Sequence, residues 1–356
     1  MKKLLKYISS ITMIISLPAI VLAGNEDRAG QSGAHELLIN PWAQSSGWGG
    51  ANSAMVHGVE AMNLNVAGLS FVRGTEVAFA HTNWLKGSNI KIESFGLAQK
   101  TGESGTIGIT IMSMNFGEIN RTTEDQPDGG AGTYKPQFIN IGIGYSKAFS
   151  NSIHGGMVLR IVSESINDVK SQGVAIDAGI QYVTGFNAAK DNLKFGIALR
   201  NVGTPMKYSG EGLTFRNRTV GPAQTINLLQ DQRTAEFEMP SLVNIGISYD
   251  LKLAEDHRLT PAVSFTSNSF IRDQFALGLE YGFKTYFMLR VGYTVDKKDK
   301  NAIIDQEISS LIGPSIGFTL QAPLGKASTK TIGIDYSYRS TKTFDGTQTI
   351  GIKLSL

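Results

Sequence analysis

The sequence predicts an all-β fold: a 14-stranded antiparallel transmembrane β-barrel with an N-terminal hatch or plug. Three observations lead to this prediction. From about residue 75 onward, hydrophobic residues recur at every second position, the period of a β-strand. The alternating segments are near ten residues long, which is the length that a tilted membrane-spanning strand requires. The chain also begins with a segment that is typical of export.

The first 23 residues have the pattern of a signal peptide. Lys2, Lys3 and Lys6 precede an apolar stretch at 8–22, and Val21-Leu22-Ala23 forms a small-residue cleavage site. The alternative is a membrane anchor, but the stretch is short for a span of about 20 apolar residues. We therefore expect a signal peptide at 1–23 and a mature protein in the bacterial outer membrane.

The charge and composition give no sign of a nucleic-acid partner, a metal or a cofactor. The chain has 33 Lys and Arg against 30 Asp and Glu, and three of the lysines belong to the signal peptide. The mature chain is thus 30 against 30 and formally neutral. There are no cysteines, and the five histidines lack the spacing of metal ligands.

The alternation separates an apolar face from a polar or glycine-rich face. In the segment at 242–251, for example, Ile245 and Ile247 alternate with Asn244, Gly246 and Ser248. In a soluble sandwich the apolar face would pack on a core, whereas in a membrane barrel it faces lipid and the polar face lines the lumen. We expect the second arrangement, with a lumen wall of polar and glycine positions only.

Fourteen segments carry the alternation, an even number as in bacterial barrels. The three longest connections, 120–135, 203–235 and 296–310, follow the third, seventh and eleventh segments, so all three are expected at the outer face. The connections expected at the periplasmic face, among them 100–104, 150–151, 185–191 and 323–327, are short, as periplasmic turns are. Both termini are therefore expected in the periplasm. The segments lie near 75–85, 89–99, 105–119, 136–149, 152–166, 171–184, 192–202, 236–251, 257–268, 271–283, 286–295, 311–322, 328–339 and 346–356.

The stretch before the first strand does not alternate. Residues 24–71 carry Trp42, Trp48 and many small residues, and this length is too short for an independent core. We expect a hatch or plug at 24–71 that folds into the lumen of a barrel at 72–356. A flexible periplasmic extension is the alternative.

No catalytic constellation is found, so an enzyme is not expected. The string Gly313-Pro314-Ser315-Ile316-Gly317 matches the motif of serine hydrolases, which requires a strand–turn–helix elbow. Here it lies within an alternating strand. The outer loops are instead the candidate surface for binding partners, because they combine charged and apolar residues. A folded lid or a solvated loop is the alternative. The candidate contact residues are Tyr134, Phe215, Arg216, Arg218 and Arg233.

Several short motifs resemble the PorV/PorQ family, which belongs with the FadL-type fourteen-stranded barrels. The run at 38–51, LINPWAQSSGWGGA, looks like the start of that family's hatch, and the run at 65–69, NVAGL, looks like its end. The runs RNVG at 200–203 and MPSL at 239–242 resemble strand-end and strand-start motifs of the family. The resemblance implies a hatch motif at Asn40, Pro41, Asn65, Ala67 and Gly68, and a barrel-assembly signal at Gly351, Leu354 and Leu356. Val66 replaces the family's proline, and Leu356 replaces its usual terminal aromatic residue.

The resemblance implies a role in protein secretion. PorV-like proteins act in the type IX secretion system of Bacteroidetes as partners of the large translocon barrel or attachment complex, and as shuttles for the C-terminal domains of secreted cargo. The alternative is a FadL-like transporter of hydrophobic small molecules. A lumen of polar and glycine positions argues against that alternative, since lipid pockets are mostly apolar.

Overall fold

The structure is a computed structural model that describes residues 28, 30–186, 189–220, 225–296, 310–325, 330–342 and 344–356. The expected signal peptide at 1–23 lies outside the described residues. The same is true of 24–27 and 29 in the expected hatch, and of 297–309 in the third long connection.

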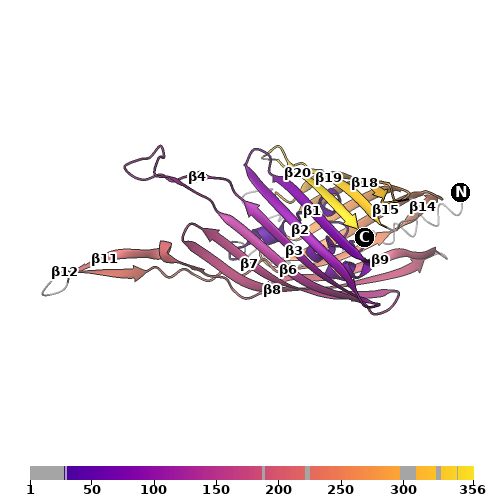
Figure 1. The fold of residues 1–356 in the computed structure, drawn as a ribbon, viewed down its shortest axis with the longest axis horizontal. Helices are drawn as coiled ribbons and strands as arrows, with labels where there is room; N and C mark the ends of the chain where they lie inside the picture. Colours follow the sequence, from indigo (N-terminus) through magenta and orange to yellow (C-terminus); the bar gives the residue numbers. More distant parts are fainter. Residues whose placement is uncertain are drawn as a thin grey trace.

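The described strands form a closed antiparallel barrel of fourteen strands (Figure 1). Each strand pairs with the next along the chain, β1 pairs with β20, and β8 pairs with β9, so the sheet has no free edge within the barrel. The strands are β1 Thr75–Trp84, β2 Ile90–Thr101, β3 Gly105–Asn115, β6 Gln137–Ala148, β7 Ile153–Ile166, β8 Val169–Phe186, β9 Ala189–Gly203, β13 Leu242–Tyr249, β15 His257–Asn268, β16 Gln274–Phe283, β17 Phe287–Asp296, β18 Gly313–Pro323, β19 Thr331–Arg339 and β20 Thr347–Ser355.

These strands confirm the fourteen segments expected from the alternation. The largest difference is at the eighth, which was expected from 236 but begins at Leu242. Residues 236–241 leave the barrel ladder because Phe237 pairs with Met206 and Pro240 has no N–H to donate. A short strand β14 (Leu251–Ala254) follows β13 and pairs with β15.

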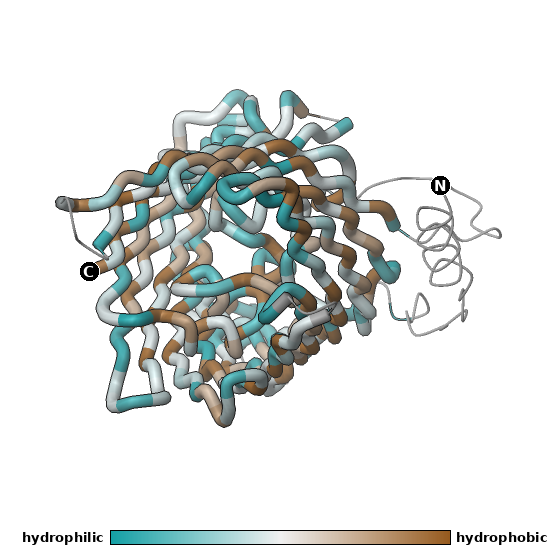
Figure 2. The backbone as a smooth tube through the Cα atoms, turned by 90° about the vertical axis from the view of Figure 1, so that its right-hand side faces the viewer, coloured by the Kyte–Doolittle hydropathy of each residue, from teal (hydrophilic) through white to brown (hydrophobic). Residues whose placement is uncertain are grey.

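The faces of the strands also follow the expectation. In β8, Ile180 is 58% exposed on the outside, whereas its neighbour Gln181 is 1% exposed on the inside. Figure 2 shows the same alternation of hydrophobic and hydrophilic residues along the wall. A closed barrel that turns its apolar side chains outward is stable only when lipid covers them. The protein therefore lies in a membrane, and this barrel type places it in the bacterial outer membrane.

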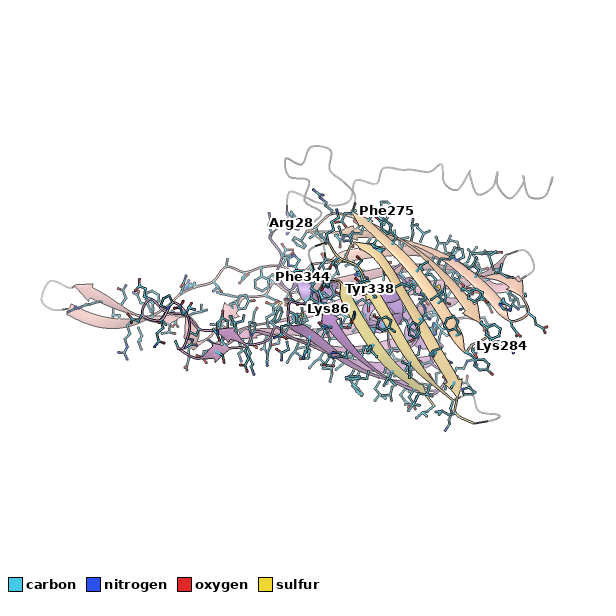
Figure 3. All side chains as sticks on the ribbon, turned by 90° about the horizontal axis from the view of Figure 1, so that it is seen from above. Arg28, Lys86, Phe275, Lys284, Tyr338 and Phe344 are labelled. Carbon is cyan, nitrogen blue, oxygen red and sulfur yellow. The ribbon has the colours of Figure 1, made fainter. Side chains whose placement is uncertain are left out.

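The two ends of the barrel differ. One end carries short connections and the C-terminal Leu356, and we call it the turn end. The other, the loop end, carries two projecting hairpins: β4 (Ile119–Asn120) with β5 (Thr133–Tyr134), and β11 (Thr214–Val220) with β12 (Thr225–Asp231). Figures 1 and 3 show the second hairpin extending well beyond the barrel. In Figure 3, Lys86 and Phe344 lie towards the loop end and Lys284 marks the turn end.

Residues 30–72, which we call the lumen segment, lie inside the barrel. They form η2 (His35–Leu38), α2 (Ala43–Gly47), α3 (Ala61–Leu64) and η3 (Val66–Phe71). Most of their side chains are buried, among them Trp42, Trp48 and Val59. No helix among the described residues has the length and apolar character needed to cross a bilayer.

A belt of glycines on the inner wall receives the lumen segment. A Cβ atom at Gly96 would lie 2.1 Å from a methyl carbon of Val59, and one at Gly278 would lie 2.4 Å from the Trp48 ring. Several belt members are direct cross-strand partners, such as Gly196 with Gly246. The inward glycines therefore provide the space in which the backbone of the lumen segment is seated. The belt comprises Gly96, Gly108, Gly144, Gly179, Gly196, Gly246, Gly278, Gly292 and Gly317.

Candidate ligand cavity in the barrel lumen

A cavity of about 500 Å³ opens at the loop end, between the start of the lumen segment and the ends of β6 and β7. This volume lies in the range of small-molecule sites. Aromatic rings form much of its wall. They come from the end of β3, from β6, from β10 (Tyr208–Ser209) and from the segment before β13, and they are Phe116, Phe138, Tyr208 and Phe237.

The cavity wall is organised by a row of cross-strand neighbours. Phe138 on β6 lies opposite Glu164 on β7, Glu164 lies opposite Ser171 on β8, and Ser171 lies opposite Tyr208 on β10. Because directly paired residues point to the same face of a sheet, all four side chains face inward. The Tyr208 hydroxyl donates a hydrogen bond of 2.5 Å to Oε2 of Glu164. Burial and this carboxylate raise the pKa of Tyr208, which keeps the phenol neutral.

The lumen segment supplies the opposite side of the cavity. His35 and Glu36 lie in η2, and both line the cavity. Burial lowers the pKa of His35, although Glu164 opposes this, and the shift favours the neutral imidazole. Burial raises the pKa of Glu36 above the ordinary value, and the negative charge of Glu164 adds to the shift. The cavity thus combines aromatic walls with acidic polar groups.

An apolar layer continues from the cavity into the barrel. Ala34 and Phe138 line the cavity and belong to a buried cluster with Leu37, Ile39 and Val162. The expectation of a lumen wall made only of polar and glycine positions is therefore wrong for this half of the barrel. Four inward methionines contribute to the layer, and their flexible side chains can rearrange around a passing ligand. They are Met112, Met114, Met206 and Met239.

A buried ion pair holds the lumen segment below this layer. Arg160 on β7 donates from Nε to Asp177 Oδ2 at 2.6 Å, and their side chains are 1% and 4% exposed. The Nη2 group of Arg160 donates to the Met62 carbonyl in α3. Asp177 also accepts the backbone N–H of Asn201, a positive-φ residue where β9 bulges against β8. Asp177 therefore neutralises Arg160, which binds α3, and also holds the bulge of β9 against β8.

Glu60 provides a second buried carboxylate within the lumen segment. It accepts hydrogen bonds from the backbone N–H and the hydroxyl of Ser45, at 3.2 and 2.9 Å. Burial raises its pKa to about 7, against a smaller opposing effect of Lys353. The folded state therefore favours a proton on Glu60 at a pH where the unfolded chain has lost it.

This shift predicts a pH dependence of stability. Between about pH 4.5 and 7 the folded state binds more protons at Glu60 than the unfolded state, so the free energy of unfolding should fall as the pH rises through this window. Above about pH 7 this contribution should no longer change. Glu60→Gln should flatten the slope within the window. Denaturant titrations of both proteins at a series of pH values measure it, and an equal slope in the two proteins would contradict the assignment.

The residues of the expected hatch motif all lie in the lumen segment, where they shape its backbone. Asn40 Oδ1 accepts from the backbone N–H of Trp42 at 3.0 Å. The Pro41 carbonyl accepts from the Thr82 hydroxyl on β1. Asn65 caps η3 by accepting from the Ala67 N–H, and it donates from Nδ2 to the Ile180 carbonyl on β8 at 3.1 Å.

Ala67 and Gly68 complete this part of the lumen segment. The Ala67 carbonyl accepts from Ser146 on β6, which attaches η3 to the wall. A Cβ atom at Gly68 would lie 1.9 Å from the Val56 carbonyl oxygen, so only glycine fits there. None of the five motif residues lines the loop-end cavity as described.

The expected outer-loop residues are divided between the two hairpins. Tyr134 lies on β5, and Phe215, Arg216 and Arg218 lie exposed on β11. Arg233 lies just after β12 and is also exposed. All five are at the loop end, but Tyr134 and the three β11 residues lie in two separate two-stranded sheets, and Arg233 lies in neither.

The residues of the expected assembly signal lie on or beside β20. Gly351 faces the lumen, Leu354 pairs with Val77 on β1, and Leu356 exchanges backbone hydrogen bonds with Thr75. Ser315, from the hydrolase-like string, lies within β18 and donates to the Gly47 carbonyl. It therefore has the role of a wall residue that holds α2.

Sequence reasoning missed the cavity residues. Glu164 and Phe138 lie on the polar face of their strands, where alternation assigns a lumen position but not a partner. One signal was available in the sequence. Met112 and Met114 occupy alternate positions on the inward face of β3, which places large apolar side chains inside the barrel. Other lining residues come from segments without a regular period, so the sequence pattern could not predict that they lie together. These residues are His35, Glu36 and Phe237.

Comparison with known proteins supports the fold. No family model matches the chain, and no curated protein matches it. Among solved structures it is similar to the Pseudomonas putida toluene transporter TodX, with a TM-score of 0.54, 12% identity, and coverage of 89% of this chain and 97% of TodX. It is also similar to the CymD monoaromatic hydrocarbon channel, with a TM-score of 0.53, 14% identity and coverage of 89% and 97%.

A Pseudomonas aeruginosa FadL homologue has a TM-score of 0.47 with 11% identity, covering 88% of this chain and 96% of that one. None of the similar structures named here is a PorV or PorQ protein. At these identities the likeness to TodX and CymD concerns the fold. Together with the strand pairing and the apolar outer wall, it identifies the chain as a fourteen-stranded outer-membrane barrel with the fold of TodX and CymD.

Proposed function

We propose that the protein binds hydrophobic small molecules in its loop-end cavity and transports them across the outer membrane. The observation that carries this proposal is the cavity of about 500 Å³ with four aromatic residues in its wall. The apolar layer beneath it is packed, so an apolar ligand would go deeper only by displacing flexible side chains such as the methionines.

The similar structures support this proposal and not the secretion role. TodX is a toluene transporter and CymD a monoaromatic hydrocarbon channel, and each is covered almost completely by the match. For the present chain, a small aromatic molecule is accordingly the first ligand to test. The glycine belt and the Arg160–Asp177 ion pair fix the lumen segment to the wall, so passage requires local rearrangement around that segment and not an open pore.

Removal of one aromatic side chain from the cavity wall should weaken the binding of toluene. Phe116→Ala takes away a ring from the cavity without touching the barrel ladder, because Phe116 follows the end of β3. Loss of one aromatic contact is expected to weaken toluene binding about tenfold, corresponding to about 1.4 kcal/mol. Toluene binding to the purified barrel, and toluene entry into proteoliposomes, measure the effect.

Phe149→Ala is the matched control. Phe149 is an exposed aromatic residue at the turn end, remote from the cavity lining, so its loss should leave toluene binding unchanged. If wild-type protein neither binds toluene nor speeds its entry, the proposed function is wrong. Equal weakening by both variants would assign the binding to the barrel wall.

A second candidate function is the binding of another outer-membrane protein, as in type IX secretion. The observation that favours it is the β11–β12 hairpin, which projects from the barrel (Figure 3). Phe215 and Leu229 are exposed on this hairpin, Leu229 to 71%. Arg216 and Arg218 lie on the same hairpin and give it a positive character. An exposed apolar and cationic hairpin suits a partner with an apolar, acidic surface.

Replacement of 214–231 by a short turn tests this candidate. Co-purification in mild detergent should recover a partner protein with the wild type and lose it with the shortened variant. An equivalent shortening of 119–134, which removes the β4–β5 hairpin, serves as the control. Recovery of the wild-type barrel alone, with protein secretion intact after gene deletion, would contradict the secretion role.

A further inference from the structure

The loop-end cavity carries two carboxylates that lack a cationic partner. Glu36 and Glu164 line it and are both half-buried, and neither forms an ion pair with any residue that the structure describes. The lining residues include no lysine or arginine. Burial lowers the pKa of His35, which disfavours a positive charge there.

The two acids act on each other across the cavity. The charge of Glu164 contributes to the raised pKa of Glu36, after the larger effect of burial. Like charges in a partly desolvated space are unfavourable, and a cation between them would remove the repulsion. An anion in the same space would add a third negative charge. On this ground, a cationic ligand is favoured over an anionic one in the cavity.

The aromatic walls favour a cation as well. Tyr208 and Phe237 stand with their ring centroids 5.5 Å apart at 34°. The faces of such rings carry negative charge density and attract organic ammonium groups, while their area accommodates an apolar body. Phe116 and Phe138 extend this surface. Aromatic walls with carboxylates are thus suited to a ligand that is apolar at one end and positively charged at the other.

We propose that the loop-end cavity selects organic ammonium ions with an apolar body, such as arylalkylammonium ions, over carboxylates of the same shape. This inference rests on the proposed function, because it names the class of hydrophobic molecule that the same cavity takes. It assigns Glu164 and Glu36 as the residues that determine specificity.

A matched ligand series tests the proposal on the full mature protein in detergent. The probes are 2-phenylethylammonium, propylbenzene and 3-phenylpropanoate, which share a phenyl ring and a short chain and differ in charge. Isothermal titration should give the cation the lowest dissociation constant, about tenfold or more below that of the anion. The neutral probe should lie between them.

Two variants identify the groups responsible. Glu164→Gln keeps an acceptor for the Tyr208 hydroxyl but removes the charge, and Glu36→Gln does the same on the lumen segment. Each should reduce the preference for the cation severalfold and leave propylbenzene binding unchanged. Glu118→Gln is the control, since Glu118 is at the loop end, exposed, and already paired with Lys135 at 2.6 Å.

The outcomes separate this inference from the function on which it rests. If none of the three probes binds, the proposed function fails. If propylbenzene binds but the cation binds no tighter than the anion, the inference is wrong and the proposed function stands. A cation preference that persists in the Glu36→Gln/Glu164→Gln double variant would also overturn the assignment. Unchanged propylbenzene binding in that variant shows that the cavity is still folded.

Discussion

Gly292→Ala should destabilise the barrel and release the lumen segment from its wall. A Cβ atom at Gly292 on β17 would lie 2.4 Å from the carbonyl carbon and oxygen of Trp48, and 2.7 Å from the backbone nitrogen of Gly49. These are backbone atoms of a turn that is fixed on both sides, because Gly49 N–H donates to Ser46 and its carbonyl accepts from Thr294. They cannot move aside as a flexible side chain would.

We expect Gly292→Ala to cost about 1–3 kcal/mol or more in the free energy of unfolding, as overpacking of a well-filled interior does. Guanidinium unfolding in detergent measures this, and limited proteolysis should cut the lumen segment faster than in the wild type. Gly333→Ala on β19 is the control, because the nearest atom to a Cβ there is a carbonyl oxygen at 3.8 Å. Equal stability of the two variants would mean that the turn at Trp48 yields easily.

Asp177→Ala should have the largest electrostatic effect. It leaves the Arg160 guanidinium buried without its carboxylate and removes the acceptor for the Asn201 N–H at the β9 bulge. Loss of one partner from a buried ion pair costs about 3–5 kcal/mol, because the other charge stays desolvated. Denaturant unfolding should show a loss of this order.

Two further variants make this measurement interpretable. Arg160→Met/Asp177→Leu removes both charges and should recover part of the loss, since an apolar pair of similar volume tolerates burial. Glu118→Ala breaks an exposed pair with Lys135 and should cost less than about 1 kcal/mol. If Asp177→Ala costs no more than Glu118→Ala, water must hydrate Arg160 in the folded barrel.

Alternation and strand length together were enough to predict the barrel wall. Ile245 and Ile247 must share a face at a period of two, and the strand length then assigns that face to lipid. The same reasoning failed at 236–241, where Phe237 continues the hydrophobic pattern but pairs with Met206. A local pattern cannot distinguish a strand of the barrel from an extended segment that turns inward.

The cavity was harder to predict because its residues come from distant parts of the chain. Glu164 and Tyr208 are brought together by β7, β8 and β10, and His35 reaches them through the path of the lumen segment. The alternation also led us to expect only polar and glycine residues on the inner wall. Met112 and Met114 show that an inward position can be apolar where a folded segment, and not water, fills the barrel.

The seam between β1 and β20 has a consequence for the order of assembly. These strands stand at the two ends of the described barrel sequence, and Thr75 and Leu356 exchange backbone hydrogen bonds there. The contacts of greatest sequence separation therefore form only when the last strand is present, a topology that slows folding. The lumen segment precedes every barrel strand in the chain, yet its enclosure is completed only when β20 pairs with β1. The lumen segment must accordingly reach the Arg160–Asp177 ion pair and the glycine belt before this seam closes.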